Sequence, residues 1–187
     1  MEVRTVYFEK RGPENTVGTL ELAKERADAL GLEDVVVASL SGDTGARASE
    51  VFKGYNFVVV AGVVGFREPN KVRLLDKNRA VIEKNGGKII FAGHAFGMLG
   101  RAVKNKFGAI QVDELIAQVL RLFGSGVKVG CEVTCMAVDA GLVASGKEVI
   151  AIGGSAKGAD TAVVLKAANT HNFFDTRILE IICKPRE

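Results

Sequence analysis

A short polar turn follows a β-branched run in the first quarter of the chain. Val35, Val36 and Val37 predict a strand, and helix-compatible residues begin at Ala46. The first backbone N–H groups of a helix are unpaired and carry partial positive charge, so Ser, Gly and Thr residues at such a position suit a phosphate or a carboxylate. The turn therefore predicts an anion site. Its residues are Ser41, Gly42, Asp43, Thr44 and Gly45.

A second glycine-rich turn, at residues 153–158, places a lysine where a phosphate could bind. Lys157 lies among glycines directly after an apolar stretch. Gly154 and Ser155 could hold an anion beside this lysine, and a solvated loop lysine is the alternative. The sequence contains neither GxxxxGK[ST] nor a GxGxxG turn in its first strand–helix unit, so no standard nucleotide motif identifies the ligand.

His94 is one of only two histidines, and it closely follows another apolar stretch. A histidine at this place could act as a general acid or base. The sequence pairs it with no Ser, Cys or carboxylate, so a hydrogen-bonded or ligand-contacting role is favoured. Asp160 is a second candidate for proton transfer. The sequence shows no carboxylate pair and no metal-ligand spacing, so no metal is expected and turnover stays an open question.

Alternating strand and helix patterns must position these residues. Apolar residues at spacings of three and four predict a helix that opens at Asn15 and Thr16 and closes at Gly31. The uniformly apolar strands are typical of parallel strands covered on both faces. The alternation predicts a three-layer α/β/α fold with a mostly parallel sheet and an antiparallel edge pair at the C-terminus. The expected strands are residues 3–8, 34–39, 56–61, 88–92, 148–152, 161–168 and 177–183.

Three more helices are expected in the middle of the chain. Pro69 can start a helix that carries Val72 and Ile82 on its apolar face. Residues 112–123 and 133–140 show two further helical stripes, and we expect both helices to cross one face of the sheet.

The carboxyl ends of the strands are the expected binding edge. In open parallel sheets, ligands bind in the crevice beyond these ends, because every strand–helix turn converges there. Met136 fits the core, and it could also offer apolar surface to a ring system in that crevice. Besides the two turns above, the expected binding residues are Asn15, Thr16, Gly62, Val63, Val64, Gly65, Phe66, His94, Thr134 and Met136.

The composition fits a single domain spanning residues 1–187, because 48% apolar residues are ample for a buried core. The net charge of +3 is spread along the chain and Trp is absent, so no nucleic-acid partner is expected. The apolar runs are too short for a membrane span, so no membrane partner is expected. Three cysteines without framework spacing indicate buried thiols and a cytoplasmic protein.

Two segments resemble the C-terminal domain of pyruvate kinases. In that family a buried strand ends in TxSGx[ST], and the loop binds a phosphate of a sugar bisphosphate. Here Ser-Leu-Ser-Gly-Asp-Thr at 39–44 matches, with Ser39 in place of the threonine. The later glycine-rich turn and terminal strands are similar to residues 149–155 and 177–183. The resemblance covers about residues 15–61 and 148–184.

The departures limit what the resemblance implies. The catalytic barrel of pyruvate kinase is absent from a chain of 187 residues, so no pyruvate kinase activity is expected. Asp43 replaces a residue that is often basic in the family, which disfavours a sugar bisphosphate. The segment 62–146 is longer than the family's equivalent. The chain looks most like stand-alone archaeal proteins related to this domain, and that resemblance implies a bound flavin mononucleotide (FMN) or a similar phosphorylated ligand.

Three functions therefore stay open from the sequence. The first is a module that binds a small phosphorylated ligand, with FMN as the leading cofactor. The second is an enzyme that uses this ligand, with His94 or Asp160 moving a proton. The third is a homo-oligomeric regulatory subunit, because edge strands and the middle helices could pair with a second copy.

Overall fold

Within residues 2–186, which this computed structural model describes, seven strands form one sheet in the order β1-β7-β6-β5-β2-β3-β4. β6 runs antiparallel to β5 and β7, and every other neighbouring pair is parallel. The predicted α/β class is confirmed, and so is the antiparallel pair at the C-terminus, which is β6 and β7. β1 adds one more strand beside β7. The strands are β1 Val6–Phe8, β2 Asp34–Ala38, β3 Asn56–Val60, β4 Lys88–Ile90, β5 Glu148–Gly153, β6 Thr161–Lys166 and β7 Arg177–Pro185.

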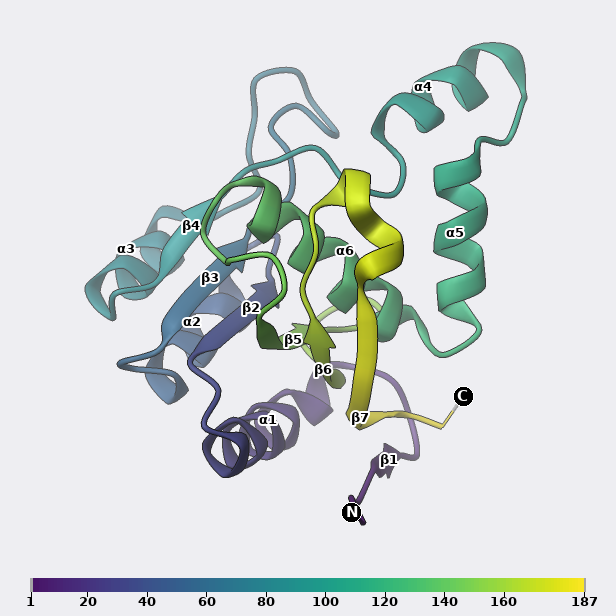
Figure 1. The fold of residues 1–187 in the computed structure, drawn as a ribbon. Helices are drawn as coiled ribbons and strands as arrows, with labels where there is room; N and C mark the ends of the chain where they lie inside the picture. Colours follow the sequence, from purple (N-terminus) through teal and green to yellow (C-terminus); the bar gives the residue numbers. More distant parts are fainter. Residues whose placement is uncertain (1, 187) are drawn as a thin grey trace.

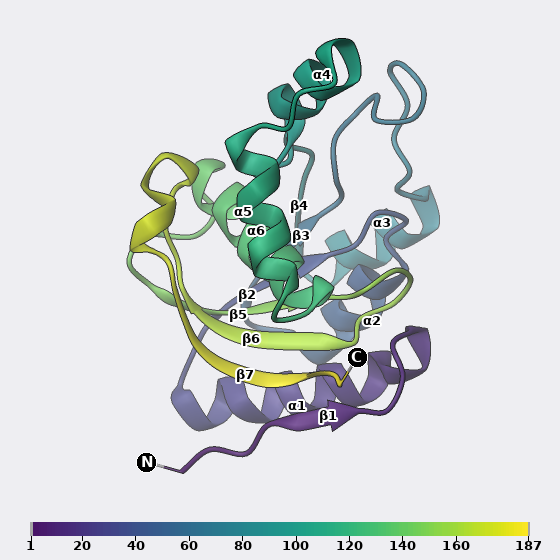
Figure 2. The ribbon, with the colours of Figure 1, turned by 90° about the vertical axis from the view of Figure 1, so that its right-hand side faces the viewer.

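Helices cover both faces of the sheet, as Figures 1 and 2 show. α1, α2 and α3 pack on one face, and α6 packs on the other. The helical segments are η1 Pro13–Asn15, α1 Thr16–Leu30, α2 Asp43–Val51, α3 Asp76–Lys84, α4 Met98–Phe107, α5 Val112–Arg121, α6 Ser125–Asp139 and η2 Thr170–Asp175. The arrangement is the expected three-layer α/β/α fold.

The alternation of side chains along β2 divides the core in two. Val35 and Val37 pack toward α1 and α2, whereas Val36 packs toward α6. All three side chains are fully buried. Because burying a valine contributes roughly 1.5 kcal/mol or more, this strand is driven into the centre of the sheet, where both of its faces are covered.

Helix α3 begins seven residues later than predicted. Pro69 lies in a loop, where the Lys71 N–H donates to the Glu68 carbonyl and Asn70 has a positive φ of 64°. A helix cannot continue through that left-handed conformation. Val72 is therefore exposed on the loop, and α3 packs through Asn78 and Ile82.

The two middle helices do not both lie on the sheet, contrary to the prediction. α6 contacts β2, β5 and β6 directly, whereas α5 packs against α6. Helix α4, which the sequence pattern did not indicate, buries only Gly100. Its apolar residues Leu99, Val103 and Phe107 recur at intervals of four, but Gly97, Gly100 and Gly108 in and around the segment are typical of a loop.

Gly126 allows α6 to approach β6 closely. A Cβ atom at this position would overlap the side chain of Thr161, the first residue of β6. Gly18 of α1 makes a useful comparison, because the nearest atom to a Cβ there would be 3.9 Å away, on the Phe8 ring. The first glycine is thus required by packing, and the second is not.

Gly126→Ala should lower the free energy of unfolding by about 2 kcal/mol, because the added methyl group overpacks a closed interface. Gly18→Ala should raise it by roughly 0.5–1 kcal/mol, because alanine loses less backbone entropy than glycine in a helix. Urea unfolding of both variants and the unsubstituted protein measures these changes. Equal effects of the two substitutions would contradict the close approach at Gly126.

Candidate functional site

A cleft of about 850 Å³ lies at the carboxyl edge of the sheet. The parallel strands β2, β3, β4 and β5 all end at this edge, and the connection from β1 to α1 and the turn from β5 to β6 reach it as well. Nine of the predicted binding residues line the cleft. They are Thr16, Ser41, Asp43, Thr44, Gly62, His94, Met136, Gly154 and Lys157.

The turn between β2 and α2 is organised by Asp43, which is the first residue of the helix. The Ser41 hydroxyl donates to Asp43 Oδ2 at 2.6 Å, and the Asn78 amide donates to Oδ1 at 2.8 Å. These hydrogen bonds, led by that of Ser41, lower the pKa of Asp43, because they stabilise the ionised carboxylate. The Asp43 carboxylate is thereby linked to Asn78 of α3, and the Ser41 hydroxyl donates its hydrogen bond to Asp43.

The two glycines of this turn serve packing. A Cβ at Gly42 would meet Leu74 and Asn78, and one at Gly45 would meet Val59. The Gly45 N–H donates to Ser39 Oγ at 2.9 Å. Of the predicted turn, the structure therefore brings Ser41, Asp43 and Thr44 to the cleft, and places the glycines behind them.

Asp160 stabilises the turn between β5 and β6 through hydrogen bonds to its carboxylate. It is fully buried, and its carboxylate accepts hydrogen bonds from the Gly12 N–H at 3.3 Å, the Ser155 N–H at 3.2 Å and the Thr161 hydroxyl at 2.9 Å. With these partners, Asp160 holds two chain segments together and does not line the cleft. Its surroundings are those of a structural residue and not of a group that exchanges protons with a ligand.

Thr16 fastens the start of α1 to the same turn. Its hydroxyl accepts a hydrogen bond from the Ala159 N–H at 3.0 Å, and its side chain also lines the cleft. Asn15 does not reach the cleft lining, and its amide donates to the Lys10 carbonyl at 2.7 Å. Only one residue of the predicted pair therefore reaches the site.

Four exposed cations line the cleft: Arg47, Arg67, Arg73 and Lys157. The two acids of the lining, Asp43 and Glu132, are both hydrogen-bonded within the protein. The cleft therefore favours an anionic ligand. The sequence patterns indicated Lys157 but none of the three arginines. Arg47 could have been found, because it lies one helical turn after the Asp43 helix start; the other two lie in a long loop without a motif.

His94 is paired with a buried carboxylate, which corrects the expectation that it has no such partner. Its Nδ1 lies 3.5 Å from Oε2 of Glu132, a residue of α6 that is 4% exposed. Glu132 also accepts hydrogen bonds from Lys128 Nζ at 2.5 Å and from the Phe96 N–H at 3.2 Å. His94 is therefore held at the cleft wall by a fixed anion.

The charge of Glu132 survives burial because of its partners. Burial alone would raise the pKa of Glu132, but the hydrogen bond to His94 and the charge of Lys128 outweigh it and lower the pKa. Lys128 is itself 7% exposed, and its ammonium group lies 5.8 Å from the centre of the Phe96 ring. The buried ion pair of Lys128 and Glu132 thus contacts His94 through the Glu132 carboxylate.

Several predicted residues lie outside the cleft lining. Val64 and Phe66 are about half exposed on the loop after β3, where the Phe66 ring lies 5.4 Å from the His94 ring. Thr134 is fully buried in α6, and its hydroxyl has no hydrogen-bond partner among residues 2–186. Besides Asn15, Gly42 and Gly45, the remaining predicted residues outside the lining are Val63, Gly65 and Ser155.

The three cysteines are free and buried, as expected. Burial raises the pKa of Cys131 and of Cys135 to about 12, and that of Cys183 to about 11. The thiols are therefore protonated at neutral pH and are poor nucleophiles. In the described part of the chain, no three His, Cys, Asp or Glu side chains are grouped so that they could hold a metal ion.

No family model matches this chain. Among the helices of residues 2–186, none is both long enough and apolar enough to cross a membrane. The cleft offers cations and a hydroxyl for an anion, apolar walls, and one histidine held by a carboxylate.

Glu132→Gln should lower the free energy of unfolding by about 3 kcal/mol at pH 7, because it leaves the Lys128 cation buried without its counterion. The pKa of Glu132 in the folded protein is below its ordinary value of 4.5, so its contribution is complete above pH 4.5 and is lost as the pH falls through the folded value. The difference between the two proteins should therefore shrink in acid. Urea titrations at several pH values measure it.

Glu114→Gln is the matched control. Glu114 pairs with Lys104 on the surface, where 24% and 45% of the two side chains are exposed. Its loss should cost less than about 1 kcal/mol. A difference between Glu132→Gln and the unsubstituted protein that stays constant with pH would contradict the lowered pKa.

Proposed function

We propose that this protein binds a small phosphorylated ligand in the cleft at the carboxyl edge of the sheet, and that the ligand is FMN. The observation that supports this is the coincidence of four exposed cations with a cleft of about 850 Å³. That volume lies within the range of about 300–1,000 Å³ that is usual for cofactor sites.

The phosphate would bind at the start of α2. Thr44 lines the cleft there and is the second residue of the helix, so its hydroxyl lies at the positive end of the helix dipole and can donate to an anion. Arg47, one turn further on, can add a charged fork of N–H donors. Asp43 does not oppose this assignment, since its carboxylate is held by Ser41 and Asn78.

The ring system would lie against the apolar part of the lining. This part includes Ala38, Val60, Val133 and Met136, which come from β2, β3 and α6. These residues take the place of Val63, Val64 and Phe66, which we expected to serve this purpose. Among phosphorylated ligands with a flat ring, FMN is favoured by the resemblance of the chain to stand-alone archaeal proteins related to the pyruvate kinase C-terminal domain. Three unpaired thiols suit a reducing, cytoplasmic setting for such a protein.

FMN should bind at least about tenfold more tightly than riboflavin, because the phosphate adds charge-assisted hydrogen bonds. Arg47→Gln should weaken FMN binding about tenfold and leave riboflavin binding nearly unchanged. Quenching of flavin fluorescence measures both affinities. Lys53→Gln, which removes an exposed cation just after the other end of α2, should change neither. Equal binding of FMN and riboflavin, or no binding of either, would contradict the proposal.

An enzymatic use of the ligand is the second candidate, and the pairing of His94 with Glu132 favours it. A histidine held by a buried carboxylate can take up or release a proton at a fixed place in the cleft. Pyruvate kinase activity is not proposed. Asp160, whose carboxylate is buried among three donors, has no part in this candidate mechanism.

If the protein turns over a substrate, His94→Ala should lower the rate by about 100-fold or more, as expected for the loss of a general acid or base. The affinity for FMN should change little by comparison. The variant is compared with His171→Ala, since His171 is exposed and lies in η2. The measurement is a screen of the FMN-loaded protein for oxidoreductase, phosphatase and isomerase activity. Any activity that survives His94→Ala does not use this histidine.

A further inference from the structure

Helix α5 carries a second apolar face that no part of residues 2–186 covers. Its inner face packs on α6 through Ala117, which is 2% exposed, and Leu120. The outer face consists of Val112, Leu115, Val119 and Leu122, with exposures of 72%, 54%, 57% and 83%. We refer to these four residues as the α5 seam.

The spacing of the α5 seam is that of paired helices. The residues follow one another at intervals of three, four and three, which is the a/d pattern of a helix that packs against another helix. β-Branched valines occupy the first type of position and leucines the second, a combination typical of two-stranded pairs. The seam therefore has the side chains and the spacing needed for a single partner helix.

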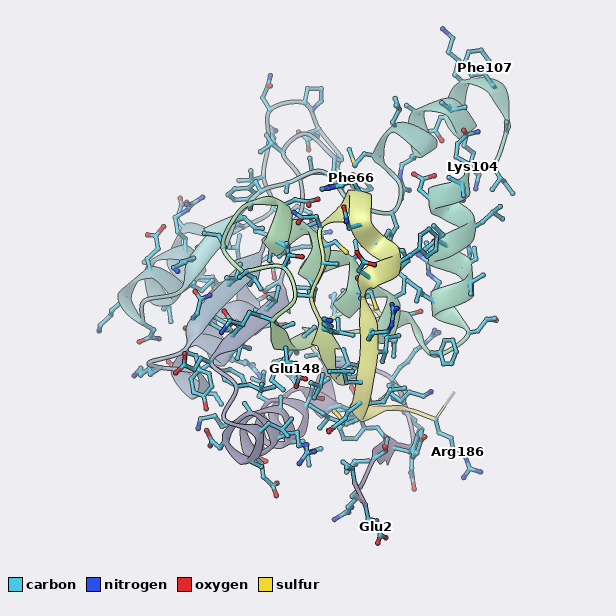
Figure 3. The ribbon with its side chains drawn as sticks, in the orientation of Figure 1. Glu2, Phe66, Lys104, Phe107, Glu148 and Arg186 are labelled. Atoms are coloured by element: carbon cyan, nitrogen blue, oxygen red, sulfur yellow. The ribbon has the colours of Figure 1, made fainter. Side chains whose placement is uncertain are left out.

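The neighbouring helix α4 extends the apolar surface. Leu99 and Phe107 of α4 are 79% and 70% exposed. Figures 1 and 2 show α4 and α5 projecting beyond the layers on the sheet, and Figure 3 shows Phe107 at the far end of α4. If each of the six side chains exposes on the order of 100 Å², their sum is about 600 Å², or about three quarters of the roughly 800 Å² per partner that a stable interface buries.

The polar residues of α5 favour a protein partner over a membrane, whereas the charged residues of α4, which are Arg101, Lys104 and Lys106, are all basic. A helix that lies on a lipid surface has a polar face rich in Lys and Arg. The polar positions of α5 are Asp113, Glu114, Gln118 and Arg121, and Glu114 is already paired with Lys104 of α4. Such a mixed face suits the solvated border of a helix pair.

We propose that two copies of this chain associate through the α5 seam, so that α5 of one copy packs against α5 of the other. A pair of identical seams is self-complementary, and a twofold dimer is the commonest assembly of soluble proteins. The seam lies outside the cleft lining, so this inference does not depend on the identity of a ligand.

The test is the mass of the full-length protein in solution. Light scattering coupled to size exclusion, over a wide range of protein concentration, should give twice the chain mass of 19.8 kDa. The double variant Leu115→Glu, Val119→Glu should be monomeric, with a dissociation constant raised at least about 100-fold, because each dimer would bury like charges. Both side chains are more than half exposed, so the variant should fold, with the same far-UV circular dichroism spectrum as the unsubstituted protein.

Phe174→Glu is the control, since it removes a side chain that is 79% exposed on η2 and is not part of the seam. It should remain dimeric. A protein that is monomeric at every concentration, or a double variant that remains dimeric, would overturn the proposal. Binding of monomers to phosphatidylglycerol vesicles through the seam would overturn it as well, in favour of a lipid surface.

Discussion

The backbone of β2 is hydrogen-bonded to β3 on one side and to β5 on the other, in parallel register throughout. This double pairing satisfies the polar groups of the most buried strand and fixes where it ends. The ends of β3 and β5 are fixed with it, because their registers are set against the same residues. The polar turns that follow these strands therefore meet at one edge, and the cleft results from the pairing.

Buried charges then give this edge a defined shape. The Asp160 carboxylate joins Gly12 to Ser155, and Glu132 joins His94 to Lys128. Taking such groups out of water is costly, and removing one partner costs more than the pair contributes. The arrangement is thus preorganised: a ligand would meet loops and a histidine that the protein itself already holds in place.

Local patterns in the sequence were enough to predict the fold and part of the site. The apolar run of β2 and the polar turn after it are adjacent in the chain, so Thr44 could be placed at a helix start and at the binding edge. The partnership of His94 with Glu132 could not be predicted, because it joins residues 38 positions apart through the packing of α6 on the sheet. The structural role of Asp160 could not be predicted for the same reason, since its partner Gly12 is 148 positions away.

The late start of α3 and the presence of α4 could not be predicted from the sequence for a different reason. The loop before α3 depends on the positive φ of Asn70, a backbone conformation that the sequence pattern does not specify. Helix α4 has apolar residues at helical spacing, Leu99, Val103 and Phe107, but the glycines at 97, 100 and 108 are typical of loops. Apolar periodicity is a weak signal where glycines interrupt a short segment.

The pairing of β1 with β7 has a consequence for how the protein is made. Among residues 2–186, β1 is the first strand, and its one neighbour in the sheet, β7, is the last. On the ribosome, where synthesis proceeds from the N-terminus, β1 must wait unpaired until residues 177–185 have emerged. The Gly12 N–H likewise waits for Asp160. Translation and completion of the binding edge are therefore coupled, and a nascent chain that lacks its last strands has no finished cleft.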